Sequence, residues 1–354
     1  MNILFLSYWG WSRGMAYVTL CYVKMLQNTG HKCFILKQGT NEISEEFKKV
    51  KATVIEYPDY IVNKEFFKTC LTNNDINITV FNEYKQWNED SNELTKVCKE
   101  LGVKTYGYLT MEKFNRQQIY DYDRIIAPTV SFQRLMRFNK VRKFSYVPFS
   151  IDLDEFPKST PRKETEKFTF FHPGGWGGVK SRKNTDIVIE AFEQLDDENT
   201  ELIITSLKPL QFNRELHPNI KIINKELSRK ELINLYYTAD ATVLPSKWET
   251  VGLPILESLA AGTPVITTAA PPMNEFIRDC TNGHTCIPIL KTYEGITVHA
   301  CEIDLSELKK KMELIMIKEL HPLLRKNSRI VIEDIYDLEK NKHYLLDLIE
   351  NDKN

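Results

Sequence analysis

Several features are scarce in this 354-residue chain, and each scarcity excludes a class of protein. The formal net charge is only −1, so the composition gives no global attraction to nucleic acid or to a membrane surface. No apolar stretch approaches the ~20 residues of a membrane span, and the short apolar run at the N-terminus has no basic residues before it. We therefore expect neither a transmembrane helix nor a signal peptide, and a cytoplasmic location.

Paired metal ligands are also scarce. The seven cysteines are scattered, odd in number and without CxxC spacing, and the seven histidines form no HExxH motif. This pattern predicts reduced, buried thiols rather than a disulfide framework or a zinc site. No Asp-x-Asp motif stands in a loop expected to face a ligand. The sequence therefore predicts no metal site.

The length and the order of apolar segments predict two domains. A single core rarely grows beyond about 250–300 residues, and apolar strands alternate with amphipathic helices along this chain. We expect an α/β protein with one doubly wound domain over residues 1–150, a second over 151–335, and a C-terminal helix over 336–354 that packs back on the first domain. The charged stretch 157–167 is predicted to link the domains.

The most informative stretch runs from residue 241 to residue 268. An apolar strand, Ala241–Leu244, is followed by a loop, by a helix with Pro254 near its first turn, and by a second strand after Gly262. Glu249 lies in the loop and Glu257 lies eight positions later, inside the helix. The residues between them that present backbone amides at the positive helix end are Thr250, Val251, Gly252 and Leu253.

This arrangement suggests a ligand. Helix amino ends bind phosphates, and carboxylates accept hydrogen bonds from hydroxyl groups. A phosphate flanked by Glu249 and Glu257 would have a polyol on either side, which describes a sugar nucleotide. The alternative is that both are ordinary carboxylates near a helix start, which helices favour in any case.

The spacing Glu-x7-Glu, followed by Ser-Leu-Ala-Ala-Gly-Thr-Pro-Val, resembles the signature of the retaining glycosyltransferases of family 4. That resemblance implies the GT-B fold, in which two Rossmann-like domains face each other across a cleft. It also implies that Glu249 orients sugar hydroxyls and that Glu257 holds the ribose. The first domain would serve the acceptor, and the second would bind the nucleotide sugar.

A second loop supports the same interpretation. Four glycines within five residues, one of them Gly175, are followed by cations and then by a helix, which is a plausible pyrophosphate cradle. In the family, a lysine just before this helix and an arginine upstream grip the diphosphate. Lys183 matches the lysine; Arg182 is the first candidate for the arginine and Lys180 the second. Ordinary surface charge remains the alternative.

The resemblance implies further contacts. A glycine in the first βα loop would lie near the donor diphosphate, and Gly14 takes that role here, unless it serves only turn geometry. The nucleobase would lie between two strand ends, near Ser206 and Leu227. Many relatives have a histidine where this chain has Thr110–Lys113, so catalytic assistance there is either absent or given by Glu112.

We expect transfer of a hexose-type sugar, with retention, from a GDP- or UDP-linked donor such as GDP-mannose to a hydroxyl on a glycan, a lipid-linked acceptor or another glycoconjugate. No cofactor is required, because cationic side chains replace a metal. The basic run 134–143 either docks on anionic lipid or an acidic acceptor, as a peripheral contact, or is a solvated helix face. The alternatives are a GT-B epimerase or phosphorylase, and a non-catalytic sugar-nucleotide-binding protein.

Overall fold

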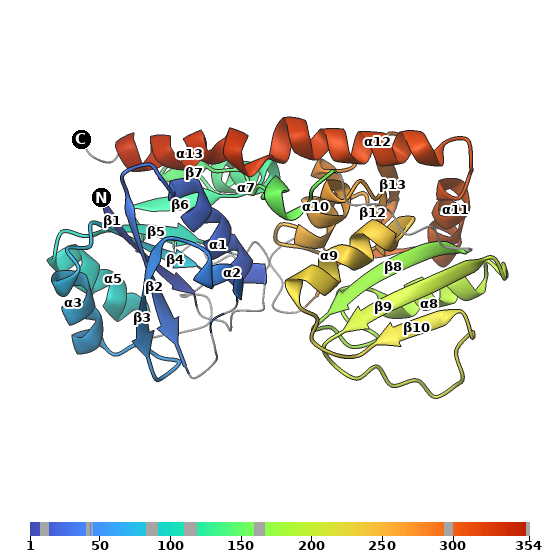
Figure 1. The fold of residues 1–354 in the computed structure, drawn as a ribbon, viewed down its shortest axis with the longest axis horizontal. Helices are drawn as coiled ribbons and strands as arrows, with labels where there is room; N and C mark the ends of the chain where they lie inside the picture. The colour runs from blue at the N-terminus through green and yellow to red at the C-terminus, as the bar shows by residue number, and fades with distance from the viewer. Residues whose placement is uncertain are drawn as a thin grey trace. The chain divides into compact units, whose positions relative to one another are not determined.

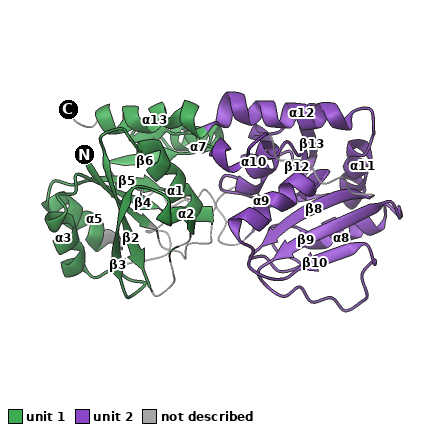
Figure 2. Ribbon diagram, viewed as in Figure 1, with its two compact units in different colours: residues 1–150, 338–354 green, residues 151–337 purple. Residues whose placement is uncertain are grey.

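A computed structural model describes residues 1–7, 14–39, 43, 45–82, 91–109, 119–158, 167–293 and 300–351 (Figure 1). The chain divides into two compact units (Figure 2). Unit 1 comprises residues 1–150 and 338–354, and unit 2 comprises residues 151–337. Among the described residues, no helix has the length and apolar character needed to cross a bilayer.

Unit 1 is built on a parallel sheet of seven strands in the order β3-β2-β1-β4-β5-β6-β7. Residues Ile3 to Leu6 of the central strand β1 are all at most 1% exposed, because helices cover both faces of such a sheet and favour continuous apolar strands. The strands are β1 (Asn2–Ser7), β2 (Lys32–Gln38), β3 (Ala52–Tyr57), β4 (Ile78–Asn82), β5 (Lys104–Tyr108), β6 (Arg124–Ala127) and β7 (Phe144–Tyr146).

The helices of unit 1 include one from the far end of the chain. They are α1 (Gly14–Leu26), α2 (Glu45–Lys48), α3 (Lys64–Asn73), α5 (Ser91–Glu100), α7 (Val130–Phe138) and α13 (Leu338–Asn351). Helix α13 packs beside α1 (Figure 1). Two hydrogen bonds fix it: the Asn341 amide donates to Ser150 Oγ at 2.9 Å, and the Tyr106 hydroxyl donates to the Leu348 carbonyl at 3.5 Å.

Unit 2 repeats the pattern with a parallel sheet in the order β10-β9-β8-β11-β12-β13. Its strands are β8 (Phe168–Gly175), β9 (Thr200–Ser206), β10 (Ile220–Ile223), β11 (Ala241–Leu244), β12 (Val265–Thr268) and β13 (Gly283–Cys286). The strand order reverses between β8 and β11. In doubly wound sheets, ligands bind outside the carboxyl ends of the strands at this switch point.

The helices and the remaining strands of unit 2 surround that sheet. The helices are α8 (Thr185–Glu193), α9 (Arg229–Thr238), α10 (Leu253–Ala260), α11 (Leu305–Ile315) and α12 (His321–Val331), and a π-helical turn spans Ile332–Tyr336. Short 3-10 turns occur at Leu153–Glu155 and Met273–Glu275, and an antiparallel hairpin joins β14 (Pro288–Lys291) to β15 (Ala300–Ile303). Ser228 and Glu231 form a reciprocal capping box at the start of α9.

The predicted fold class is confirmed, since both units are doubly wound parallel sheets. The sequence did not predict β7, β13 or the β14–β15 hairpin, which are only three or four residues long. Strand β8 extends into the glycine loop, because the backbone up to Gly175 still pairs with β9. One expectation about thiols was wrong: Cys280 is exposed in a turn, whereas the other six cysteines are buried.

Candidate active site

Two loops meet at the switch point of unit 2, one after β8 and one after β11. Four hydrogen bonds hold them together. His172, buried in β8, contacts the Val243 carbonyl through Nδ1 at 2.8 Å and Thr185 Oγ1 through Nε2 at 2.9 Å. Burial lowers the pKa of His172 to about 4, so the ring is a neutral structural link. The Asn184 side-chain amide donates to the Pro245 carbonyl at 2.8 Å, and the Lys247 backbone amide donates to the Arg182 carbonyl at 2.7 Å.

These links bring three of the predicted site residues into one ion cluster. Lys183 Nζ lies 2.5 Å from Glu249 Oε1, and Arg182 Nη1 lies 2.5 Å from Glu249 Oε2. Ser246 Oγ donates to Glu249 Oε1 at 2.8 Å. The Lys183 and Glu249 side chains are 8% and 5% exposed, whereas that of Arg182 is 37% exposed. The cluster thus has a dry interior and one cation that reaches solvent.

The electrostatics keep Glu249 ionised. Burial acts to raise its pKa, but the charges of Arg182 and Lys183 and their hydrogen bonds outweigh burial and lower the pKa to about 2. The carboxylate therefore carries no proton to donate at neutral pH. It can accept hydrogen bonds from hydroxyl groups or hold cations in place.

A pocket of about 330 Å³ opens beside this cluster. Its walls are formed by the backbone of the glycine loop, by two cations and by two indole rings: Gly174, Trp176, Gly177, Arg182, Lys183 and Trp248. A Cβ at Gly174 would lie 2.9 Å from the Thr205 carbonyl oxygen, so only glycine lets the backbone lie there. Polar groups between aromatic walls are typical of ligand sites.

The sequence predictions missed the two tryptophans. Trp248 lies in the loop between β11 and α10, and its ring lies 5.3 Å from that of Tyr293. The short hairpin behind it is joined to the loop, since the Cys301 amide donates to the Lys247 carbonyl at 2.9 Å and Lys247 pairs with Glu302 at 2.7 Å. A tryptophan beside Glu249 was visible in the sequence, but only the fold shows that Trp176 lines the same pocket.

Glu257 lies in a different environment from the one that its spacing suggests. It is 2% exposed within α10, and both of its carboxylate oxygens have protein partners. Arg229 Nη1 donates to Oε1, and the Tyr236 hydroxyl donates to Oε2 at 3.0 Å. Arg229 also pairs with Glu155 at 3.0 Å. A ribose would have to share or displace these hydrogen bonds.

The backbone amides expected to bind phosphate lie as predicted at the entrance to α10. Gly252 adopts φ +83°, a left-handed conformation, and directly precedes the helix, in which Pro254 occupies the first turn. Val251 is 6% exposed, and Thr250 and Leu253 are half-buried. The structure places this segment directly after Glu249.

The other predicted site residues lie outside the ion cluster. Gly175 ends β8 with φ +61°, next to the pocket-lining Gly174. Ser206 ends β9, and its carbonyl accepts a hydrogen bond from the Asn224 amide at 2.8 Å, which joins the strand end to the segment holding Leu227. Gly14 begins α1 in unit 1. The loop before it, residues 8–13, and the segment 110–113 with the candidate catalytic residue Glu112 lie outside the described residues.

Residues 153–289 match the family model of the glycosyl transferases group 1. Among curated proteins, the chain is 28% identical over 180 residues to the alpha-monoglucosyldiacylglycerol synthase of Streptococcus pneumoniae, covering 46% of this chain and 41% of that protein. The matched segments span less than half of the length of the curated relatives.

Solved structures match over the whole chain. A glycosyltransferase from Rickettsia africae has a TM-score of 0.77 at 15% identity, with 99% of this chain and 98% of that chain covered. Anabaena Alr3699/HepE in complex with UDP-glucose has a TM-score of 0.72 at 11% identity, with 99% and 100% covered. The chain therefore has the GT-B fold, and its residues 153–289 are similar to the glycosyl transferases group 1.

Proposed function

We propose that this protein transfers a hexose-type sugar from a nucleoside-diphosphate sugar to a hydroxyl group of a glycan, lipid-linked or other glycoconjugate acceptor, with retention of the anomeric configuration, as in family 4. One observation carries the proposal: the pocket at the switch point of unit 2 combines Lys183 and Arg182 with a buried, ionised Glu249. A diphosphate needs the cations and the glycine-loop backbone, and a sugar needs the carboxylate.

The chemistry follows from where charge develops. As the bond between the anomeric carbon and the diphosphate oxygen breaks, negative charge grows on the leaving diphosphate. Lys183 and Arg182 line the pocket, so their positive charges can stabilise that developing negative charge. The acceptor oxygen then attacks the face from which the diphosphate leaves, and its proton passes to the leaving phosphate. No step uses a protein acid, which agrees with the lowered pKa of Glu249.

Glu249 has a limited number of acceptor positions. Its two oxygens offer about four lone pairs, and Lys183, Arg182 and Ser246 occupy three of them. One remains for a sugar hydroxyl, and more become available when the cations turn toward the diphosphate. The indoles of Trp176 and Trp248 offer the apolar faces on which the C–H side of a pyranose ring packs.

UDP-sugars are the first donors to test, because the similar HepE structure carries UDP-glucose. GDP-linked donors such as GDP-mannose form the second group. Glu257, with the segment near Ser206 and Leu227, would hold the nucleoside. Gly14 of unit 1 would contact the diphosphate. None of these steps needs a metal or a cofactor.

The acceptor is proposed to be membrane-associated. On and after α7, the basic residues of the run 134–143 are exposed, and Phe138 beside them is 85% exposed. An exposed aromatic ring among cations is typical of a segment that lies on an anionic lipid surface. The S. pneumoniae relative is named as a synthase of a glycolipid, which favours a lipid acceptor over a soluble glycan.

The proposal is tested by incubating the full chain with UDP- and GDP-sugars and a panel of glycan and glycolipid acceptors. We expect nucleoside diphosphate release that depends on acceptor, and a product whose anomeric configuration by NMR equals that of the donor. Release without acceptor, or a requirement for inorganic phosphate, would favour the epimerase or phosphorylase alternative. Binding without any turnover would favour a sensor.

A pair of lysine variants assigns the turnover to this pocket. Lys183→Ala should lower kcat by a factor on the order of 10²–10³, the usual cost of losing one stabilising group for a developing anion. Lys221→Ala serves as the matched control, because Lys221 pairs with Glu201 at 2.5 Å on the surface of the same unit, with its side chain 63% exposed. Equal activity of the two variants would refute the assignment.

A further inference from the structure

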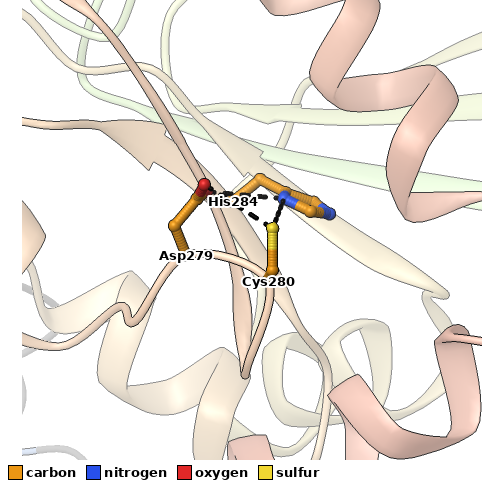
Figure 3. Close-up of side chains that lie close together, drawn as sticks. All are labelled: Asp279, Cys280 and His284. Carbon is orange, nitrogen blue, oxygen red and sulfur yellow. Dashed lines mark hydrogen bonds and ion pairs between the residues drawn. The ribbon is translucent and has the colours of Figure 1, made fainter.

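A second group of side chains that could ligate a metal lies at the opposite end of the strands of the same sheet. Asp279, Cys280 and His284 lie on and beside the turn that leads into β13, and their polar atoms point toward one another (Figure 3). His284 follows Gly283, which pairs with Val265, the first residue of β12. The group is therefore at the amino ends of the strands, whereas the proposed donor pocket is at the carboxyl ends.

The turn is fixed by its backbone. The Cys280 amide donates to the Gly283 carbonyl at 2.9 Å, and Cys280 itself has φ +59°. A Cβ at Gly283 would collide with the Val265 carbonyl, so glycine is required for the turn to pack against β12. The Thr285 amide donates to Asp279 Oδ1 at 2.8 Å and orients that carboxylate. The three side chains are thus held before any ligand binds.

The three side chains lie close together, and Asp279 contacts each of the other two through a different carboxylate oxygen. His284 Nδ1 lies 3.4 Å from Asp279 Oδ1, Cys280 Sγ lies 3.7 Å from Asp279 Oδ2, and Cys280 Sγ lies 3.9 Å from His284 Nδ1. Zinc bonds of about 2.0–2.3 Å to nitrogen, oxygen and sulfur give tetrahedral edges of about 3.4–3.6 Å. The observed separations of 3.4–3.9 Å are close to these values.

The burial of His284 is a second observation that favours a metal site. The ring is 3% exposed, and its Nε2 has no hydrogen-bond partner among the described residues. The polar neighbours of the ring are therefore on the Nδ1 side, which faces Asp279 and Cys280. The Nδ1 atom of a neutral imidazole can offer a lone pair to a metal, and this is the atom that faces Asp279 and Cys280. Asp279 and Cys280 are exposed and leave a coordination position open to water.

We propose that Asp279, Cys280 and His284 bind a thiophilic divalent cation of the Zn²⁺ class, with water as the fourth ligand. On binding, the Cys280 thiol releases its proton to solvent and a sulfur–metal bond forms. The sequence prediction of no metal site considered paired cysteines and HExxH spacing and not the Cys-x3-His spacing, so this proposal departs from it. The role is structural, because the cation would hold the turn to β13, away from the donor pocket.

One charge works against tight binding. Lys311 Nζ, on α11, lies 3.5 Å from Asp279 Oδ2 and repels a second cation. The Nε2 proton of a metal-bound His284 would also lack an acceptor, and absent outer partners of this kind weaken metal affinity about 10–100-fold. We therefore expect a site that is weaker than a closed four-ligand zinc site.

The test uses the full chain, purified with a phosphine reductant and titrated with Co²⁺ and then Zn²⁺. We expect one Co²⁺ per chain, with the sulfur-to-cobalt charge-transfer absorption of a thiolate ligand and the visible bands of tetrahedral geometry. Zn²⁺ should displace it. Wild-type protein without the charge-transfer band would overturn the proposal, whatever the outcome of the donor experiments.

Variants locate the site. Cys280→Ser should abolish the charge-transfer band, and Asp279→Asn should weaken Zn²⁺ binding at least about tenfold. Both residues are exposed, so neither change should prevent folding. His343→Gln is the control, because His343 is an exposed histidine on α13 that contacts only the Lys340 carbonyl among the hydrogen bonds assigned to it. Zn²⁺ affinity that is equal in wild type and in both site variants would also overturn the proposal.

Discussion

Lys183 Nζ lies 2.5 Å from Glu249 Oε1, and both side chains are more than nine-tenths buried. Removing one member of a buried ion pair leaves the other as an uncompensated charge, which typically costs about 3–5 kcal/mol. Arg182 and Ser246 still contact Glu249 when Lys183 is removed, so the cost for Lys183→Ala should fall near or below the lower limit. Urea unfolding of unit 2 measures it.

The surface pair in the same unit is the comparison for that measurement. Lys221→Ala should change the free energy of unfolding by less than about 1 kcal/mol, because the Lys221 side chain is 63% exposed and Thr169 still donates a hydrogen bond to Glu201. If the two variants lose the same stability, Lys183 and Glu249 do not form the buried pair described above.

The pH dependence of stability reports on Glu249. Its pKa is lowered to about 2 in the folded protein, against about 4.3 for an unfolded glutamate. The stability that its ionised form contributes is fully present above about pH 5 and is lost as the pH falls toward 2. We therefore expect the stability difference between wild type and Glu249→Gln to be constant from pH 5 to 8 and to shrink below pH 4.5. A difference that changes near pH 7 would contradict the assigned pKa.

The buried Glu257 should contribute directly to nucleotide binding in unit 2, and Arg229 is its ion-pair partner. We expect Glu257→Gln to reduce the increase in melting temperature caused by UDP, because the variant loses a charged acceptor for the ribose hydroxyls. Glu155→Gln removes the other carboxylate partner of Arg229 and should leave the UDP effect intact. If both variants reduce the effect equally, Glu257 acts by holding Arg229 and not by holding the ribose.

The tryptophans should act on the sugar and not on the nucleotide. Trp248→Ala removes an indole from the pocket wall, so we expect a higher KM for the nucleotide sugar with a nearly unchanged Kd for the free nucleoside diphosphate. Trp248→Phe keeps an apolar ring and should recover part of the loss. An equal loss of affinity for donor and for diphosphate would mean that the ring supports the phosphate loop instead.

The basic run 134–143 should bind anionic membranes. Replacing Arg134, Arg137 and Lys140 with glutamine should weaken binding to vesicles that contain phosphatidylglycerol, measured by co-sedimentation. The expected loss of binding free energy is about 1 kcal/mol per charge removed. Phosphatidylcholine vesicles serve as the control and should bind neither protein. If the triple variant sediments as well as wild type, the run is an ordinary solvated surface.

Much of the fold was predictable, because parallel strands buried on both faces appear in the sequence as short apolar runs. The predicted range of β11, Ala241–Leu244, agrees with the structure at both ends. The ion cluster was predictable only as a set of residues. The sequence indicated Glu249, Lys183 and Arg182 as members of one site, but 66 positions separate Lys183 from Glu249, and no local pattern states their distance.

Other features depend on tertiary packing. Arg229 and Tyr236 can donate hydrogen bonds to the Glu257 carboxylate only because α9 lies beside α10. The spacing of the glutamates in the sequence cannot show this packing. The wall formed by Trp248 requires the β14–β15 hairpin, whose strands are too short to give a periodic pattern. The exposed Cys280 depends on a left-handed backbone conformation that is unusual for cysteine.

The most direct test of the central claim is a thermal-shift scan of wild type and Lys183→Ala with UDP, GDP, ADP and their sugar derivatives. A ligand at about 100 times its Kd stabilises a protein by roughly 2.7 kcal/mol, which raises Tm by about 5–10 °C for a domain of this size. We predict such a rise for one base only, and a smaller rise in the variant. If no nucleotide raises the Tm of the wild-type protein, the pocket at Lys183 and Glu249 is not a donor site.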